Sequence, residues 1–183
     1  MEPRTLKDVL SGVLAAGRAA GTLPEAMRVV GKGEERLAVL AARLGLDRRT
    51  GTIAGRPFPA AALITAFDAD TVTLAGRWGP DLLEKAGARP LGPAPGEGDA
   101  VWSLDTLVRE APAVVIFAGD EPPSSDVVSR FRAGLPGVRL FHIDAARVNR
   151  PGPSLVRTVE LLAAAVHGAA AGITPTPGEL VPL

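Results

Sequence analysis

The most constraining feature of the sequence is a strand–helix–strand pattern in its second half. Apolar runs predict buried strands over residues 113–118 and 138–143, and a helix is expected between them over 125–133. Such a crossover is right-handed and leaves its two strands parallel. Another short apolar run, over 60–67, predicts a further buried strand. The pattern therefore predicts an α/β fold, a three-layer αβα Rossmann-like lobe with a mainly parallel sheet.

Helical signals surround this region. Thr5 and Asp8 can form a capping box at the start of a first helix. A second helix is expected to end at Gly45, and Gly31 and Gly33 are expected to weaken it and to allow a bend or break. A long closing helix is expected over 154–167. A helical segment therefore precedes the predicted lobe.

Changes in composition divide the chain into three parts. Residues 1–50 are predicted to be the helical segment and residues 51–168 the α/β lobe. The polar, Gly- and Pro-containing stretch at 46–59 is expected to connect them. Residues 169–183 show no periodicity, and we predict a flexible tail there.

The composition excludes several kinds of chemistry. The 20 basic residues balance the 20 acidic ones, which argues against a nucleic-acid partner bound through bulk charge. The absence of Cys excludes disulfides, thiol catalysis, Fe–S clusters and Cys-ligated zinc. His142 and His167 are the only histidines, so a His-rich metal site is not predicted.

Two features bear on location. No apolar run reaches the roughly 20 residues that a membrane span needs. The opening MEPRTLKDVLSG lacks the charged-then-apolar order of a secretory signal. As written, the sequence is therefore expected to be soluble and without an export address.

Three loops are the predicted ligand site, because open parallel sheets bind ligands outside the carboxyl ends of their strands. They cover residues 68–78, 119–125 and 144–152. Arg side chains there offer planar forks for carboxylate, phosphate or amide oxygens, and Trp78 offers a flat apolar face. The loops suit a bulky ligand with an apolar body and polar edges. The alternative is that the arginines are solvated and that Trp78 packs on the lobe.

Catalytic motifs are weak. The sequence holds no GxSxG elbow, P-loop or GxGxxG fingerprint. Asp68, Asp120 and Asp144 each follow a predicted strand, and together they could bind Mg²⁺. No nucleophile, base or phosphate loop accompanies them, so a Mg²⁺-dependent α/β enzyme is the weakest alternative. We expect no enzymatic activity, and neither a metal nor a cofactor is predicted.

Several segments together resemble one known family. These are LAGRWGPDLLEKAGARPLG (74–92), WSLDTLVREAPAVVIFAG (102–119) and the ending GLPGVRLFHIDAARVNRPGPSLVRTVELLAAAVHG (134–168). They resemble the helical-backbone (class III) substrate-binding proteins of ABC importers, and RPGP at 150–153 is most similar to the cobalamin (vitamin B12)-binding branch. The opening TLKDVLSGVLAAGRAAGTLPEAMRVV resembles the stretch leading into the helix that joins the two lobes of these proteins.

The resemblance implies an inter-lobe helix followed by a complete C-terminal lobe. It implies that Trp78 is a ligand-facing aromatic residue on the same rim as Arg150, and that Asp105 occupies an acidic position that pairs with the ABC permease, where the family has Glu. The ligand-binding residues expected in all are Arg77, Trp78, Gly119, Asp120, Glu121, Asn149 and Arg150.

The ligand and partners also follow from the resemblance. A cobalamin or other corrinoid is expected, or else a ferric siderophore, while the absence of Tyr argues against the Tyr-ligated haem branch. No N-terminal lobe is recognisable, so we expect a truncated chain or a half-protein that binds weakly unless a second lobe is supplied. The alternative is a non-catalytic interaction module that binds another chain or itself. The family works outside the cytoplasm.

Overall fold

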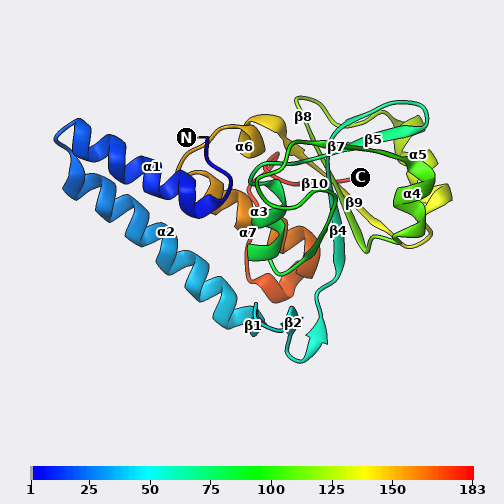
Figure 1. Ribbon diagram of the computed structural model, residues 1–183. Helices are drawn as coiled ribbons and strands as arrows, with labels where there is room; N and C mark the ends of the chain where they lie inside the picture. Colours follow the sequence, from blue (N-terminus) through cyan, green and yellow to red (C-terminus); the bar gives the residue numbers. More distant parts are fainter. Residues whose placement is uncertain (1) are drawn as a thin grey trace.

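The computed structural model describes residues 2–183 and confirms an α/β fold, with helices on both faces of a central, mainly parallel sheet (Figure 1). The helices are α1 (Leu6–Ala19), α2 (Leu23–Leu44), α3 (Gly79–Lys85), α4 (Leu104–Arg109), α5 (Ser125–Gly134), α6 (Ala145–Asn149) and α7 (Leu155–His167), followed by the 3₁₀ turn η1 (Gly168–Ala171). The strands are β1 (Leu46–Asp47), β2 (Thr52–Ile53), β3 (Arg56–Pro57), β4 (Ala60–Phe67), β5 (Thr71–Leu74), β6 (Arg89–Leu91), β7 (Ala100–Ser103), β8 (Val114–Gly119), β9 (Arg139–Asp144) and β10 (Val181–Pro182).

The main sheet has the strand order β10-β9-β8-β4-β5-β7, and β6 pairs with β4. Strands β9, β8, β4 and β6 are parallel, as the sequence predicts for β8–α5–β9. Strands β5, β7 and β10 run antiparallel to their neighbours at the two sides. Because β4, β8 and β9 are parallel, their carboxyl ends lie at one edge of the sheet, where the predicted ligand loops begin.

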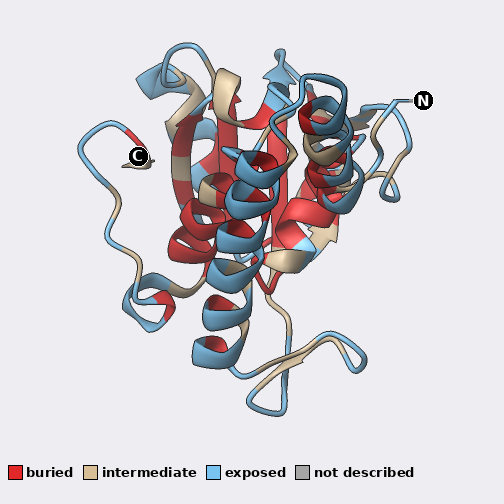
Figure 2. Ribbon diagram, turned by 90° about the vertical axis from the view of Figure 1, so that its left-hand side faces the viewer, coloured by how far each residue is buried: buried red, intermediate tan, exposed pale blue. Residues whose placement is uncertain are grey.

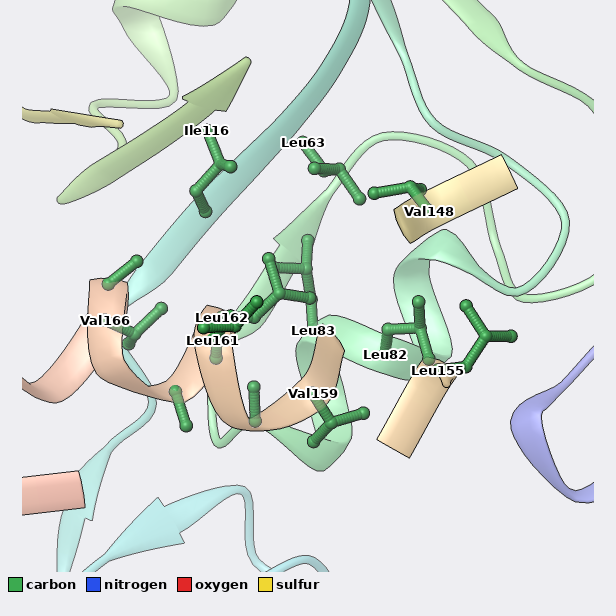
Figure 3. Packing of buried hydrophobic residues seen from close by; sticks show 14 of the residues in the cluster. Leu63, Leu82, Leu83, Ile116, Val148, Leu155, Val159, Leu161, Leu162 and Val166 are labelled. Atoms are coloured by element: carbon green, nitrogen blue, oxygen red, sulfur yellow. The ribbon is translucent and has the colours of Figure 1, made fainter. Parts of the chain in front are cut away.

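Both faces of the sheet are buried, which explains the continuous apolar run of β8. Ile116 packs toward α3 and α7, whereas its neighbour Phe117 packs toward α5. Figure 3 shows the first of these layers, where Leu63 and Ile116 from the sheet face Leu83 of α3 and Leu162 of α7. In Figure 2, buried residues concentrate in the central strands, and the helices in front are mostly exposed. The sheet and α7 therefore form a rigid base for the loops at the carboxyl edge.

The α1–α2 hairpin extends from the lobe (Figure 1) and begins with the predicted capping box. The Thr5 hydroxyl accepts from the Asp8 N–H at 3.2 Å, and the Asp8 carboxylate accepts from the Thr5 N–H at 3.0 Å. The buried carboxylate of Asp81 on α3 also accepts from the Leu6 N–H at 2.8 Å. The start of α1 is therefore fastened to the lobe.

The bend or break that Gly31 and Gly33 would allow in α2 does not occur, since the helix is continuous from Leu23 to Leu44. A Cβ added at Gly33 would lie 3.0 Å from Val156 Cγ2 on α7. Gly33 therefore serves the close approach of two helices, and packing against α7 offsets its low helix propensity.

Two segments contain regular structure that the sequence analysis did not predict. The connection at 46–59 contains the small antiparallel sheet β1-β2-β3. Instead of a tail without regular structure, the residues after His167 form η1 and then β10, which pairs with β9. Side chains of α2, α5 and α7 hold this segment. Because these contacts come from distant parts of the chain, no local periodicity predicts its structure. Within residues 2–183, no helix combines the length and apolarity required to cross a bilayer.

Candidate functional site

A hollow of about 400 Å³ lies at the carboxyl edge of the sheet, between the loop after β5, the loop before β7 and helix α6. We call it the carboxyl-edge hollow. Its lining includes side chains from all three of these segments and from β4. Those used below are Thr65, Arg77, Trp78, Asp99, Val148 and Asn149.

Thr65 reaches the hollow because it follows Ala61 and Leu63 on one face of β4, and this face packs in the layer that contains Trp78. The pairing register between β4 and β5 shifts between Ile64 and Ala66. Thr65 is therefore the extra residue of a β-bulge and has no partner residue on β5. The Thr65 hydroxyl also donates to the Thr73 carbonyl at 3.4 Å, at the limit of hydrogen-bond length.

Arg77 is held in a strained backbone conformation. Its φ is +51°, in the left-handed region that favours glycine. Its N–H donates to the Glu97 carbonyl at 2.6 Å, and its own carbonyl accepts from the Gly96 N–H at 2.7 Å. Such a residue costs about 1–3 kcal/mol and persists only where its surroundings impose it. The exposed guanidinium, which forms no ion pair within residues 2–183, is therefore presented at the hollow by a fixed loop.

The neighbouring Gly76 completes this loop contact. Its N–H donates to Asp99 Oδ1 at 2.8 Å. A Cβ added at Gly76 would lie 2.4 Å from the Gly98 carbonyl carbon, so the two loops approach too closely for any side chain there. The walls of the hollow on this side are therefore fixed by backbone contacts.

Trp78 differs from the ligand-facing aromatic that we expected. It is 5% exposed and belongs to the core layer that contains Leu63 and Leu83. Its indole Nε1 donates to the Val148 carbonyl at 2.7 Å. The ring therefore closes the base of the hollow and holds α6, and only a small part of its surface can face a ligand.

Helix α6 stands where the sequence predicts only a loop. The Asp144 carboxylate accepts from the Ala146 N–H at 2.7 Å and caps the helix, and the Thr158 hydroxyl donates to the Arg147 carbonyl at 2.8 Å. Asn149, at its end, is exposed and lines the hollow. Arg150 is the next residue and is also exposed, but it is not among the residues that line the hollow.

The loop after β8 lies at the same edge but outside the hollow. Asp120 and Glu121 are exposed. The Gly119 carbonyl lies 2.9 Å from Nε2 of the buried His142, so Nε2 carries the proton that it donates. His142 Nδ1 is buried without a hydrogen-bond partner in the described part of the chain. The seven predicted ligand residues thus share one edge of the sheet, while Arg77, Trp78 and Asn149 alone among them line the hollow.

Three residues at this edge escape the sequence prediction. Thr65 and Asp99 line the hollow but belong to none of the three predicted ligand loops. Thr65 precedes the loop at 68–78, and Asp99 lies between that loop and the one at 119–125. Phe67 ends β4, is 39% exposed and packs edge-on against Phe117. An aromatic residue at the end of a predicted buried strand was a usable signal for Phe67. Thr65 also had one, because it is the one polar residue in the apolar run 60–67.

Similar folds occur among solved structures, although no protein-family model and no curated protein matches the sequence. A periplasmic binding protein from Veillonella parvula superposes with a TM-score of 0.71 at 19% identity, over 90% of this chain and 57% of that one. A periplasmic heme-binding protein from Pseudomonas aeruginosa gives 0.71 at 23% identity, over 98% and 65%. The periplasmic vitamin B12-binding protein of Vibrio cholerae gives 0.65 at 14% identity, over 94% and 65%.

This chain has the class III periplasmic binding protein fold. It spans less than two thirds of the length of these three structures. All three of these structures are periplasmic binding proteins.

The other residues singled out in the sequence are three aspartates, and each lies outside the carboxyl-edge hollow. Asp105 is exposed in the first turn of α4, on the opposite face of the sheet from α6 and α7. Asp144 caps α6, and Asp68 Oδ1 accepts from the Ala69 N–H at 2.7 Å. The described residues contain no cluster of three side chains suited to a metal ion, so the Mg²⁺ alternative has no geometric support.

A second hollow, of about 510 Å³, runs along α1. Val9, Val13 and Ala16 form its apolar side, and Pro151, just after α6, closes one end. We call it the α1 groove. It is separate from the carboxyl-edge hollow but adjoins the same α6–α7 connection.

Proposed function

We propose that this chain is a ligand-binding lobe of an ABC-importer substrate-binding protein, and that the carboxyl-edge hollow receives the polar edge of a corrinoid such as cobalamin. The main observation in favour is the strained loop that holds Arg77 at a hollow that Asn149 also lines. Sites that bind ligands hold their polar groups in place before the ligand arrives.

The donors and acceptors of the hollow suit a ligand edged with amides. Arg77 and Asn149 can donate to amide oxygens, and the exposed carboxylate of Asp99 can accept from amide N–H groups. A corrinoid combines such amides with a large apolar ring. A ferric siderophore offers oxygen acceptors but fewer amide N–H donors, so it is the second choice.

The size of the hollow bears on affinity. About 400 Å³ is near the lower end of ordinary ligand pockets, and it would bury only part of a corrinoid. We therefore propose that a second lobe, from another part of a longer chain or from another protein, covers the rest. Alone, this chain is expected to bind in the range of about 0.1–1 mM, since a half-covered ligand gives up much of its contact area.

Equilibrium dialysis against cyanocobalamin tests the proposal. We expect saturable binding that Asn149→Ala weakens about tenfold, the cost of one hydrogen bond to a partly buried group. Arg109→Ala on α4 is the matched control and leaves binding unchanged. The same dialysis is carried out with ferrichrome, a ferric siderophore. Tighter binding of ferrichrome than of cyanocobalamin would replace the corrinoid assignment. Absence of binding to both at about 1 mM would reject the function.

The same proposal includes a contact with the ABC permease and a location outside the cytoplasm. Asp105, exposed at the start of α4, would contact an Arg of the permease, and the lobe would work outside the cytoplasm. We expect Asp105→Asn to leave cyanocobalamin binding unchanged while it weakens binding to the permease in nanodiscs. Equal permease binding by both forms would remove this role for Asp105.

A non-catalytic interaction module is the second candidate, and the α1 groove favours it. Its apolar side and its 510 Å³ volume fit an apolar side chain from another protein or a second copy. Sedimentation velocity of the chain alone tests whether a second copy fills the groove. A monomer at high concentration would count against self-association.

A further inference from the structure

The C-terminal segment, residues 172–183, is fastened to the lobe at both ends, and we call it the strap. Its β10 pairs with β9, with Val181 opposite His142. At its start, Arg43 of α2 donates to the Gly172 carbonyl at 3.0 Å. At its far end, Arg132 of α5 donates to the Leu183 carbonyl. The strap therefore crosses the lobe from α2 to the sheet edge beside β9.

Glu179 is the central contact of the strap. It is only 9% exposed, and its Oε2 accepts from the Thr176 N–H at 2.9 Å. Arg157 of α7 donates through Nε to Oε1 at 3.2 Å, and Arg147 Nη1 lies 3.2 Å from the same oxygen. A carboxylate between two guanidiniums is strongly bound when it is shielded from water.

The ion pairs continue beyond Glu179. Arg157 also donates to Glu160 at 3.1 Å, and Arg36 of α2 donates to the other oxygen of Glu160 at 2.8 Å. Charges therefore alternate from α2 through α7 to the strap and on to α6. Loss of Glu179 would leave two arginines without their shared partner.

Helix α6 depends on side-chain contacts from other parts of the chain. It has five residues, too few for an isolated helix to be stable in water. Apart from its own cap, three side chains hold it: Trp78 at the Val148 carbonyl, Thr158 at the Arg147 carbonyl and Glu179 at the Arg147 guanidinium. The third of these comes from the strap.

We propose that Glu179 is a positioning residue for the carboxyl-edge hollow: through Arg147 it holds α6, and with it Asn149, in the ligand-binding position. This proposal takes the identity of the ligand from the proposed function. The strap's hold on α6 can be tested without any ligand.

Hydrogen exchange measured by mass spectrometry on the full chain is the first test. Glu179→Gln keeps the size of the side chain and removes its charge. We expect exchange in residues 145–150 to accelerate about tenfold, while exchange in α4 stays unchanged. The control is Glu110→Gln, which removes an exposed carboxylate 3.9 Å from Arg89 and should change neither region.

A double-mutant comparison separates positioning from general loss of stability. Arg147→Gln should accelerate exchange in 145–150 in the wild-type background and add nothing in the Glu179→Gln background. Unchanged exchange in 145–150 for Glu179→Gln, or equal acceleration throughout the chain, would overturn the proposal.

Cyanocobalamin dialysis then links the strap to the ligand. We expect Glu179→Gln to weaken binding several-fold, and Glu179→Asp to restore part of it. Wild-type affinity in Glu179→Gln despite faster exchange in 145–150 would contradict the positioning role. Absence of binding by the wild-type chain would reject the proposed function, while the exchange result would still decide whether the strap holds α6.

Discussion

Trp78 and Val148, 70 residues apart, are joined by an indole N–H that donates to a buried carbonyl at 2.7 Å. The bond ties the loop after β5 to helix α6, and both segments line the carboxyl-edge hollow. The residue predicted to face the ligand thus has a mainly structural role, because it holds the two walls of the hollow together.

The first prediction concerns this bond. Trp78→Phe keeps an aromatic ring in the core but leaves the Val148 carbonyl without its donor. We expect a loss of about 1–3 kcal/mol in the free energy of unfolding, since an unsatisfied buried acceptor is costly. Urea denaturation measures it, with Trp102→Phe on β7 as the half-buried control. Equal losses in the two variants would show that ring volume alone matters.

The second prediction separates the backbone of Arg77 from its side chain. Arg77→Gly removes both the guanidinium and the left-handed strain, whereas Arg77→Ala removes the guanidinium alone. We expect Arg77→Gly to be more stable than Arg77→Ala by about 1 kcal/mol. Both should bind cyanocobalamin equally weakly in dialysis. Equal stability would contradict strain at this residue.

The third prediction is a loss of stability in acid. The hydrogen bond from Arg157 is the main cause that lowers the pKa of Glu179 from 4.5 to about 2. A lowered carboxyl pKa in the folded state stabilises the protein above pH 4.5, and that contribution is lost as the pH falls from about 4.5 to about 2. At most about 3.4 kcal/mol of the free energy of unfolding is involved.

The control for this acid window is Glu179→Gln, whose unfolding free energy should vary less below pH 4.5 than that of the wild type. His167 titrates in a separate window, because burial lowers its pKa from 6.5. Its contribution is complete above pH 6.5 and declines as the pH falls through its lowered value. Parallel pH profiles for wild type and Glu179→Gln below pH 4.5 would contradict the assignment.

The fourth prediction compares two glycines within α2. An added Cβ at Gly31 meets nothing within 4 Å, whereas one at Gly33 lies 3.0 Å from Val156 Cγ2. We expect Gly31→Ala to stabilise the protein by about 0.5–1 kcal/mol through helix propensity. Gly33→Ala should show no such gain, because the close contact with α7 offsets it. Thermal denaturation measures both, and an equal gain at Gly33 would show that α7 moves aside easily.

The sequence alone determined the local elements of this protein. The capping box of Thr5 and Asp8, the strands around β8 and the crossover through α5 all follow from patterns of a few adjacent residues. The rule that ligands bind at the carboxyl ends of parallel strands then located the edge that holds the hollow.

Only the tertiary structure decided which residues at that edge line the hollow. The burial of Trp78 and the helix α6 depend on contacts across the fold. The strap shows the reason most clearly. Arg43 donates to the Gly172 carbonyl although the two residues are 129 positions apart, and no local pattern in the sequence predicts that they meet. Periodicity records the burial of adjacent residues, whereas pairing between distant residues is settled only when the chain is packed.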